Sequence, residues 1–265
     1  MWVQIAIACM VAASYLGMGI VLHRAHQHDR QGEVATLTFT SRVRYYLQLA
    51  FRLLVVALFC IILVIDVQEY GTTAFSYYTI WNFALQTVYH ALAAGFLLSH
   101  WNVHGGATVV VQSRPLNSLF DICLTNSLLV AVVFWTELYY PTMPWYSYIQ
   151  HGVNTMLFVL ELFLGDFDVQ SEDFQYAGMS PTIYTTFIWI SHDTWLHGWW
   201  PYDFLSMDTS TAPLWYLGIF LGHFVLFGAA YGLSRVKTRC FPTLQPEMTS
   251  IPGNSARRTS YQSIV

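Results

Sequence analysis

The sequence has few charged residues. Only 10% of its 265 residues are Asp, Glu, Lys or Arg, whereas 55% are hydrophobic. Eleven basic residues stand against fifteen acidic ones, for a net charge of −4, and the basic residues form neither a stripe nor a nucleic-acid motif. DNA and RNA are therefore set aside as partners. A composition this apolar is typical of membrane proteins.

Cysteine is also scarce, with four residues in the chain. Cys9, Cys60 and Cys123 fall within apolar stretches, so no disulfide framework is expected. Cys240 follows the last apolar stretch and lies beside Lys237. This position is compatible with S-palmitoylation and equally with a free thiol.

Long apolar stretches are what the sequence has in abundance. A helix that crosses a bilayer needs about 20 mostly apolar residues, and seven candidates are present: 2–22, 48–67, 76–98, 118–139, 148–164, 181–200 and 214–234. We therefore expect an all-α polytopic membrane bundle of about seven transmembrane helices over residues 1–240. The tail, 241–265, is rich in Pro, Ser and Thr and is predicted to be disordered.

The positions of the basic residues predict the orientation. The first apolar stretch has no basic residue before it and is followed by Arg24 and Arg30, so we interpret it as a retained anchor. With seven spans, every Lys and Arg falls on one side, which the positive-inside rule assigns to the cytosol. The amino terminus is then lumenal or extracellular and the carboxyl terminus cytosolic. The acidic loop "DFDVQSEDF", 166–174, would lie on the cytosolic side as an exception.

Two polar segments lie on the predicted cytosolic side. The first, between the first two spans, holds His23, His26 and His28, and a solvated interfacial loop explains these as well as a metal site does. The second is the tail, where "RRTS", "YQSI" and the terminal "SIV" resemble phosphorylation, sorting and PDZ-binding patterns. Each pattern is short, and together they raise the expectation of a cytosolic partner for the tail.

A polar line runs through the third span at intervals of three or four residues: Thr79, Asn82, Gln86 and His90. The fifth span carries a similar line, formed by His151, Asn154, Thr155 and, more loosely, Glu161. Such residues commonly form hydrogen bonds between membrane helices. They also mark functional sites, because polar groups are costly at membrane depth.

Thr79 and His151 differ from the rest because each is expected in the lumenal first turn of its span. A hydroxyl becomes a nucleophile when an adjacent neutral imidazole takes its proton. The positive end of a helix disfavours imidazolium, and first-turn N–H groups beside Thr79 could stabilise an oxyanion. The pair therefore predicts nucleophilic catalysis, although the sequence gives no distance between the two residues.

Histidines elsewhere leave a metal or haem site as a further interpretation, with His90, His151, His192, His197 and His223 as its candidates. His192 and His197 are five residues apart and point about 140° away from each other on a helix. They make a poor pair of ligands, and no supporting carboxylate set is visible.

Three segments, "YYTIWNFALQTVYH", "YIQHGVNTMLFVLELFL" and "WISHDTWLHGWWPYDFL", resemble the androgen-induced-gene family of multi-pass threonine hydrolases. The resemblance covers about 77–205. It implies cleavage of fatty acid esters of hydroxy fatty acids with Thr79 as nucleophile and His151 as its partner, without a cofactor, in the endoplasmic reticulum or plasma membrane. The supporting residues that we expect are Asn82, Gln86, Asn154, His192 and Asp193.

The chain departs from that family in three ways. It has an additional span at the amino terminus, Asn154 replaces a second histidine, and Asp193 replaces the second member of a His-His pair. The additional span and "YYTIWNF" also resemble the rolling-stone family of seven-span proteins linked to cell fusion. A non-catalytic role in fusion, adhesion or signalling is the alternative that the sequence leaves open.

Overall fold

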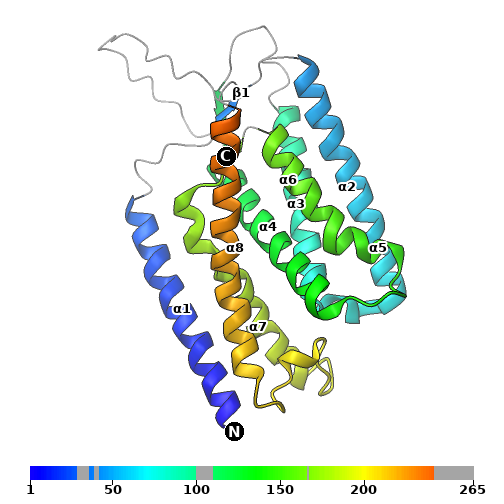
Figure 1. Cartoon of the computed structure of the whole chain (residues 1–265), viewed down its shortest axis with the longest axis vertical. Coiled ribbons are helices and arrows are strands. Elements are labelled where there is room, and N and C mark those ends of the chain that lie inside the picture. Colours follow the sequence, from blue (N-terminus) through cyan, green and yellow to red (C-terminus); the bar gives the residue numbers. More distant parts are fainter. Residues whose placement is uncertain (29–35, 39–41, 100–109, 166, 242–265) are drawn as a thin grey trace.

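The computed structural model describes residues 1–28, 36–38, 42–99, 110–165 and 167–241 (Figure 1). The α-helices are α1 (Trp2–His28), α2 (Arg42–Tyr70), α3 (Tyr78–Ser99), α4 (Arg114–Val133), α5 (Trp145–Tyr148), α6 (Asn154–Leu164), α7 (Met179–Asp193) and α8 (Ala212–Cys240). The 3₁₀ turns are η2 (Gly71–Ser76), η6 (Ser171–Tyr176) and η7 (Asp203–Leu205), and the π-helical turns are η4 (Phe134–Leu138) and η5 (Ile149–Val153). Helix occupies some part of each of the seven predicted spans.

Four of these helical segments are long and apolar enough to cross a membrane: Trp2–Ile20, Val43–Ser76, Arg114–Leu138 and Ala212–Cys240. The fold is thus that of a helical membrane protein. The expected all-α fold class is confirmed, and the one addition within the described residues is a short ladder in which β1 (Thr36–Thr38) pairs antiparallel with β2 (Val110–Gln112). Both strands lie in segments between helices, where short pieces of chain can satisfy each other's backbone groups.

The segment after the first span differs from the predicted loop at its start. α1 continues to His28, so the three histidines that were expected in a loop are helical, and His23 is exposed. The predicted disorder of the tail lies outside the described residues, except for Phe241.

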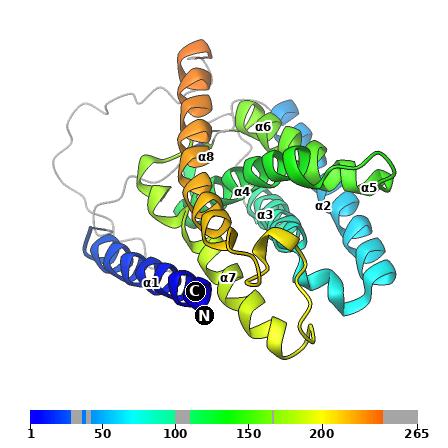
Figure 2. The same ribbon diagram turned by 60° about the horizontal axis from the view of Figure 1, so that its bottom comes forward.

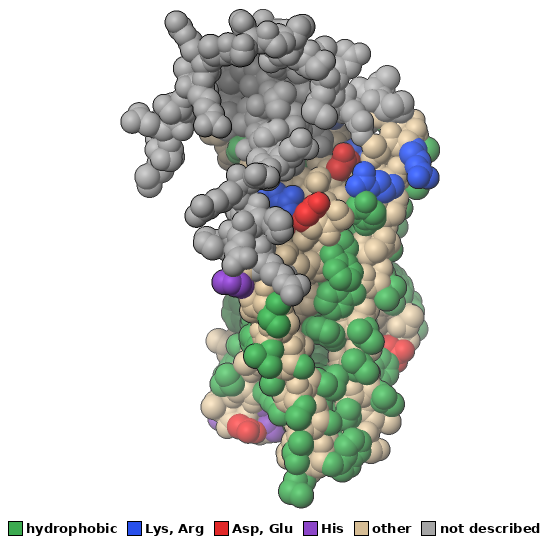
Figure 3. Space-filling model, turned by 90° about the vertical axis from the view of Figure 1, so that its left-hand side faces the viewer, with side chains coloured by type: hydrophobic (Ala, Val, Ile, Leu, Met, Phe, Trp, Pro, Cys, Tyr) green, Lys and Arg blue, Asp and Glu red, His purple; other side chains and the backbone are tan. Residues whose placement is uncertain are grey.

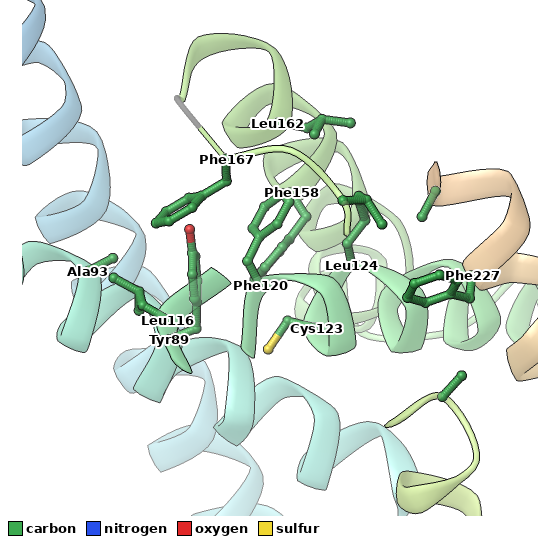
Figure 4. Close-up of a cluster of buried hydrophobic side chains, with 13 residues drawn as sticks. Tyr89, Ala93, Leu116, Phe120, Cys123, Leu124, Phe158, Leu162, Phe167 and Phe227 are labelled. Carbon is green, nitrogen blue, oxygen red and sulfur yellow. The ribbon is translucent and has the colours of Figure 1, made fainter. Parts of the chain in front are cut away.

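A hydrophobic core joins α3, α4, α6 and α8 (Figure 4). Its centre is a set of aromatic rings: Phe120 stacks on Phe158 and on Phe167, with ring centroids 5.9 and 5.7 Å apart, and Tyr89 packs at the edge of all three. These large interdigitated rings fix the positions of α3 and α6 relative to each other. Thr79 lies on α3, and His151 lies in η5, the turn directly before α6.

Basic side chains gather at one end of the bundle, which we call the basic end (Figure 3). There the Arg44 side chain donates to the Leu164 carbonyl, at the end of α6, with an N–O distance of 3.1 Å. The acidic loop that seemed an exception lies at the same end, because Asp173 pairs with Arg114 at 2.7 Å and Asp168 with Lys237 at 3.1 Å. Two of its carboxylates are thus paired with basic residues.

The opposite end of the bundle carries the beginning of α3 and the end of α7 (Figure 1). The chain turns from α2 into α3 through η2, where Gly71 has φ = 58°, a value that glycine adopts without steric cost. A second turn after α7 contains His197 at φ = 51° and Gly198 at φ = 86°. These turns bring Thr79 and the segment after α7 to the same end.

α1 lies at the edge of the bundle (Figure 2). Its main contacts are with α7, α8 and η6, and it is separated from α2 by the other helices. Trp2, Leu16 and Ile20 on α1 are 61%, 70% and 54% exposed, as expected of side chains that face lipid.

Candidate active site

Thr79 and His151 meet at the end of the bundle opposite the basic end. The Thr79 Oγ1 and His151 Nε2 atoms are 3.2 Å apart, within hydrogen-bonding distance. Thr79 is the second residue of α3, and His151 lies in η5, 72 positions further along the chain. The sequence predicted both residues, and the structure brings them together.

The second ring nitrogen of His151 determines the direction of this hydrogen bond. Nδ1 lies 2.7 Å from the Ser147 carbonyl oxygen. A carbonyl oxygen can only accept, so Nδ1 carries the hydrogen, and a neutral imidazole must then accept at Nε2. Thr79 therefore donates its hydroxyl proton towards His151, which is the polarity that a general base requires.

His151 is held by aromatic neighbours. Its ring stacks on Phe134, with centroids 3.9 Å apart and planes 13° from parallel. The Trp135 indole N–H donates to the His151 carbonyl at 3.1 Å. Phe134 and Trp135 are the first two residues of the π-helical turn η4. Residues of η4 therefore hold His151, which lies in the other π-helical turn, η5.

The predicted position of His151 in the first turn of its helix was wrong. The helical segment begins three residues earlier than expected, at Trp145, and passes through the π turn η5 before α6. The helix-end dipole argument for a neutral His151 therefore does not apply, and the Ser147 carbonyl orients the ring instead.

Two hydrogen bonds fix this segment to α2. Gln150, next to His151, donates to Asp66 at 2.5 Å, and the Tyr146 hydroxyl donates to Glu69. Both acceptors lie in the last turns of α2, so the carboxylates at the end of that helix position the histidine. The sequence analysis missed these partners, because no spacing links α2 to a residue 84 positions away.

Tyr202 is a further residue at the site, to which the sequence analysis assigned no role. Its hydroxyl oxygen accepts a hydrogen bond from the Tyr78 N–H at 3.1 Å and interacts with the Thr79 hydroxyl and backbone. Burial raises the pKa of Tyr202 to about 12, although its contacts with Thr79 and with the Tyr78 N–H act in the opposite direction. The phenol thus keeps its proton at neutral pH and can donate it. The Tyr202 oxygen also occupies the Tyr78 N–H, which is one of the first-turn donors that we expected to face an oxyanion directly.

Thr79 also borders a cavity of about 530 Å³. The cavity lies between α1, α7 and α8 and is lined almost entirely by apolar side chains, such as Ile7, Val133 and Phe220. A volume of this size is ordinary for a small-ligand site. His151 does not line the cavity, so Thr79 stands between an apolar space and its histidine.

The remaining polar residues of the third span are not gathered around Thr79. The Asn154 amide donates to Gln86 at 3.3 Å and joins α6 to α3. His90 is fully buried with four aromatic rings around it, and Asn82 has no hydrogen-bond partner for its side chain among the residues that the structure describes. These residues join or fill the bundle and do not contact the candidate nucleophile.

His192 and Asp193 pair with each other at 2.6 Å near the surface, and His192 stacks on Trp200. Their hydrogen-bond and ring contacts within the described residues do not include Thr79 or His151.

The sequence analysis left two buried polar groups without partners. Glu161 accepts hydrogen bonds from Arg52 at 2.6 and 3.0 Å and from the Tyr89 hydroxyl at 3.0 Å. His223, considered only as a metal ligand, lies 2.8 Å from the Tyr78 hydroxyl and 2.8 Å from the Ile219 carbonyl. In the part of the chain that the structure describes, no three His, Cys, Asp or Glu side chains are grouped to hold a metal ion.

The fold and the pair together define a helical membrane protein with a hydroxyl–imidazole dyad beside an apolar cavity. No protein-family model, curated protein or solved structure matches the chain.

Proposed function

We propose that the protein is an integral membrane hydrolase of lipid esters in which Thr79 is the nucleophile and His151 the general base. The observation that carries the proposal is the 3.2 Å contact between Thr79 Oγ1 and His151 Nε2, with Thr79 open to an apolar cavity. Fatty acid esters of hydroxy fatty acids are the substrates that the family resemblance suggests.

The chemistry follows from the hydrogen-bond directions. Thr79 Oγ1 attacks the ester carbonyl while His151 Nε2 takes its proton, and the Ser147 carbonyl supports the resulting imidazolium through Nδ1–H. The oxyanion accepts a hydrogen bond from the Tyr202 hydroxyl. His151 then returns the proton to the departing alkoxide, which leaves an acyl-threonine and a free alcohol.

Water completes the cycle. His151 is only partly buried, so water from the end of the bundle reaches it. A water molecule gives a proton to Nε2 and attacks the acyl carbonyl, and the proton returns to Thr79 Oγ1 as the fatty acid leaves. No cofactor enters either half of the reaction.

The proposal includes seven membrane spans with a lumenal or extracellular amino terminus, in the endoplasmic reticulum or plasma membrane. The basic end supports this orientation, because the ion pairs of Arg114 and Lys237 and the Arg44 contact gather there. Thr79 and His151 then lie at the lumenal end.

The test compares purified wild type with Thr79→Ala, Thr79→Ser and His151→Ala, using a fatty acid ester of a hydroxy fatty acid and a fluorophosphonate probe. Thr79→Ala should lower hydrolysis by about a thousandfold or more and abolish labelling. Thr79→Ser keeps the hydroxyl and should retain measurable hydrolysis.

Thr87→Ala is the matched control. Thr87 is buried on the same helix, but its hydroxyl donates to the Phe83 carbonyl one turn back. Full labelling of Thr79→Ala would remove Thr79 as the nucleophile.

The non-catalytic alternative is favoured by the bond between Gln86 and Asn154, which shows that part of the polar line joins helices. A seven-span fusion, adhesion or signalling protein would use Thr79 and His151 in the same way. It predicts that Thr79→Ala and His151→Ala keep cellular function and that wild type hydrolyses no ester.

A further inference from the structure

The wall of the cavity beside Thr79 includes a helix that the proposed catalysis does not use. Ile7, Met10, Val11, Ser14 and Gly17 of α1 line it at intervals of three or four residues, so one face of α1 forms this wall. α4, α7 and α8 supply most of the other lining residues.

The cavity is elongated along α1. Ile7 and Gly17 are ten residues apart, which at 1.5 Å per residue corresponds to about 15 Å of helix. Thr79 and Tyr202 border the cavity near the end opposite the basic end, and Gln175 of η6 borders it on the side of the basic end. The space therefore suits a long, narrow ligand that begins at the threonine.

The lining offers no charged partner along the body of a ligand. It contains no Asp, Glu, Lys or Arg side chain. Several of its hydroxyls are already hydrogen-bonded within the protein: Ser14 to the Met10 carbonyl at 2.8 Å, and Thr182 to the Gly178 carbonyl at 2.7 Å. An unsubstituted hydrocarbon chain is the chemistry that such walls favour.

The packing of α1 bears on how a ligand enters the cavity. α1 packs mainly on α7, α8 and η6, and many of its large side chains are exposed. A Cβ atom added at Gly17 would meet no other atom within 4 Å. The contact of α1 with the rest of the bundle is therefore thin along the cavity.

From these features we propose that the cavity is an acyl-chain site and that α1 is its lateral gate. The acyl chain of a lipid passes from the bilayer between α1 and its neighbours α7 and α8 and lies along α1, with its carbonyl carbon at Thr79. This inference rests on the proposed function for the identity of the ester but adds the binding site, the entry route and a role for α1.

The test uses a diazirine-labelled palmitate photoprobe in lipid nanodiscs, with peptide mapping of the labelled residues. It is carried out in the Thr79→Ala background, so that labelling reports binding without turnover. Labelled peptides should come mainly from α1, α4, α7 and α8, which line the cavity, and excess unlabelled palmitate should compete.

Gly17→Phe is the informative variant and Gly19→Phe its control. Both glycines are exposed, but only Gly17 lines the cavity, and Gly19 lies about 200° around the helix from it. A phenyl ring at position 17 should therefore enter the cavity, and one at position 19 should not. Each methylene of the acyl chain that the phenyl ring excludes from the cavity should weaken binding by about fourfold. Gly17→Phe should therefore reduce palmitate labelling by about tenfold or more and reduce the binding of octanoate much less. Gly19→Phe should be labelled as strongly as the Thr79→Ala protein that carries neither phenylalanine.

Equal labelling of the two phenylalanine variants, or labelling mapped to peptides that hold none of the residues lining the cavity, overturns the acyl site. Competition by cholesterol but not by palmitate overturns it as well. These outcomes are distinct from failure of the hydrolase. If the labelling pattern is as expected but wild type releases no fatty acid from esters, the acyl site stands and the proposed catalysis fails.

Discussion

At the scale of single residues, the hydrogen bonds of His151 give the candidate site its direction. Ser147 occupies Nδ1 and leaves Nε2 to accept from Thr79. A backbone carbonyl thus orients the imidazole, whereas in many hydroxyl–histidine enzymes a carboxylate has this role. Because a carbonyl has no net charge, it supports an imidazolium less strongly than a carboxylate does.

Tyr202→Phe tests the proposed oxyanion donor. The substitution keeps the ring but removes the hydroxyl that contacts Thr79 and the Tyr78 N–H. Loss of one such donor typically lowers kcat by about 10²- to 10³-fold, and KM should change little because the donor acts mainly on the transition state. Steady-state hydrolysis with purified protein measures both constants.

Tyr45→Phe is the control for Tyr202→Phe. Tyr45 is also buried, and its hydroxyl donates to the Leu97 carbonyl near the basic end, far along the bundle from Thr79. It should keep the wild-type kcat. If Tyr202→Phe raises KM and leaves kcat unchanged, Tyr202 only helps to bind substrate.

At the scale of elements, the sequence predicted the helices better than their ends. The apolar stretches alone located helix in all seven ranges, because hydrophobic length is a strong signal. The start of the fifth was misplaced by three residues, since Trp145 to Tyr148 are amphipathic and do not extend the apolar run. The π turn around His151 has no sequence signature, because it depends on contacts from α2 and η4.

For the site, the sequence analysis identified the two central residues and missed the residues that hold them. Thr79 and His151 were identified from residue type, depth and the family resemblance. Asp66, Ser147 and Tyr202 could not be predicted in the same way, because their roles depend on distances between segments that are far apart in the chain.

The ion pair between Arg52 and Glu161 joins α2 to α6. Both side chains are almost fully buried, at 0% and 1% exposed. In the sequence, Arg52 counted only among the basic residues of the predicted cytosolic side, and its pairing with Glu161 was not predicted. A buried charge without its partner is costly, so Arg52→Met alone should destabilise the protein by about 3–5 kcal/mol.

The double variant Arg52→Met/Glu161→Leu completes the test. It removes both charges and should recover most of the lost stability. Thermal unfolding in one detergent, followed for wild type, both single variants and the double variant, gives the coupling free energy. Additive losses from the two single changes would show that the pair contributes no specific stabilisation.

At the scale of the whole molecule, the basic end predicts how the protein sits in the membrane. Arg44, Arg114 and Lys237 interact with carbonyls and carboxylates at that one end. We expect that end to face the cytosol. An Asn-linked glycosylation acceptor added before Met1 should then be modified in microsomes, and one added after Val265 should not.

A glycosidase-sensitive shift in gel mobility measures that modification. An acceptor placed in the loop after α7, which lies at the end opposite the basic end, is a second reporter and should be modified together with the one before Met1. Modification of the carboxyl-terminal acceptor alone would show that the orientation is the reverse of the expected one and that Thr79 lies at the cytosolic end.

The edge position of α1 has a consequence for how the protein is made. α1 leaves the ribosome first, but its main partners α7 and α8 are translated last. During synthesis α1 therefore remains surrounded by lipid until α7 and α8 have been inserted, and α2 to α6 assemble without it. Chains halted before α7 should hold a core that still lacks α8 and a first helix without its main partners, and the cavity wall closes only in the last step of biogenesis.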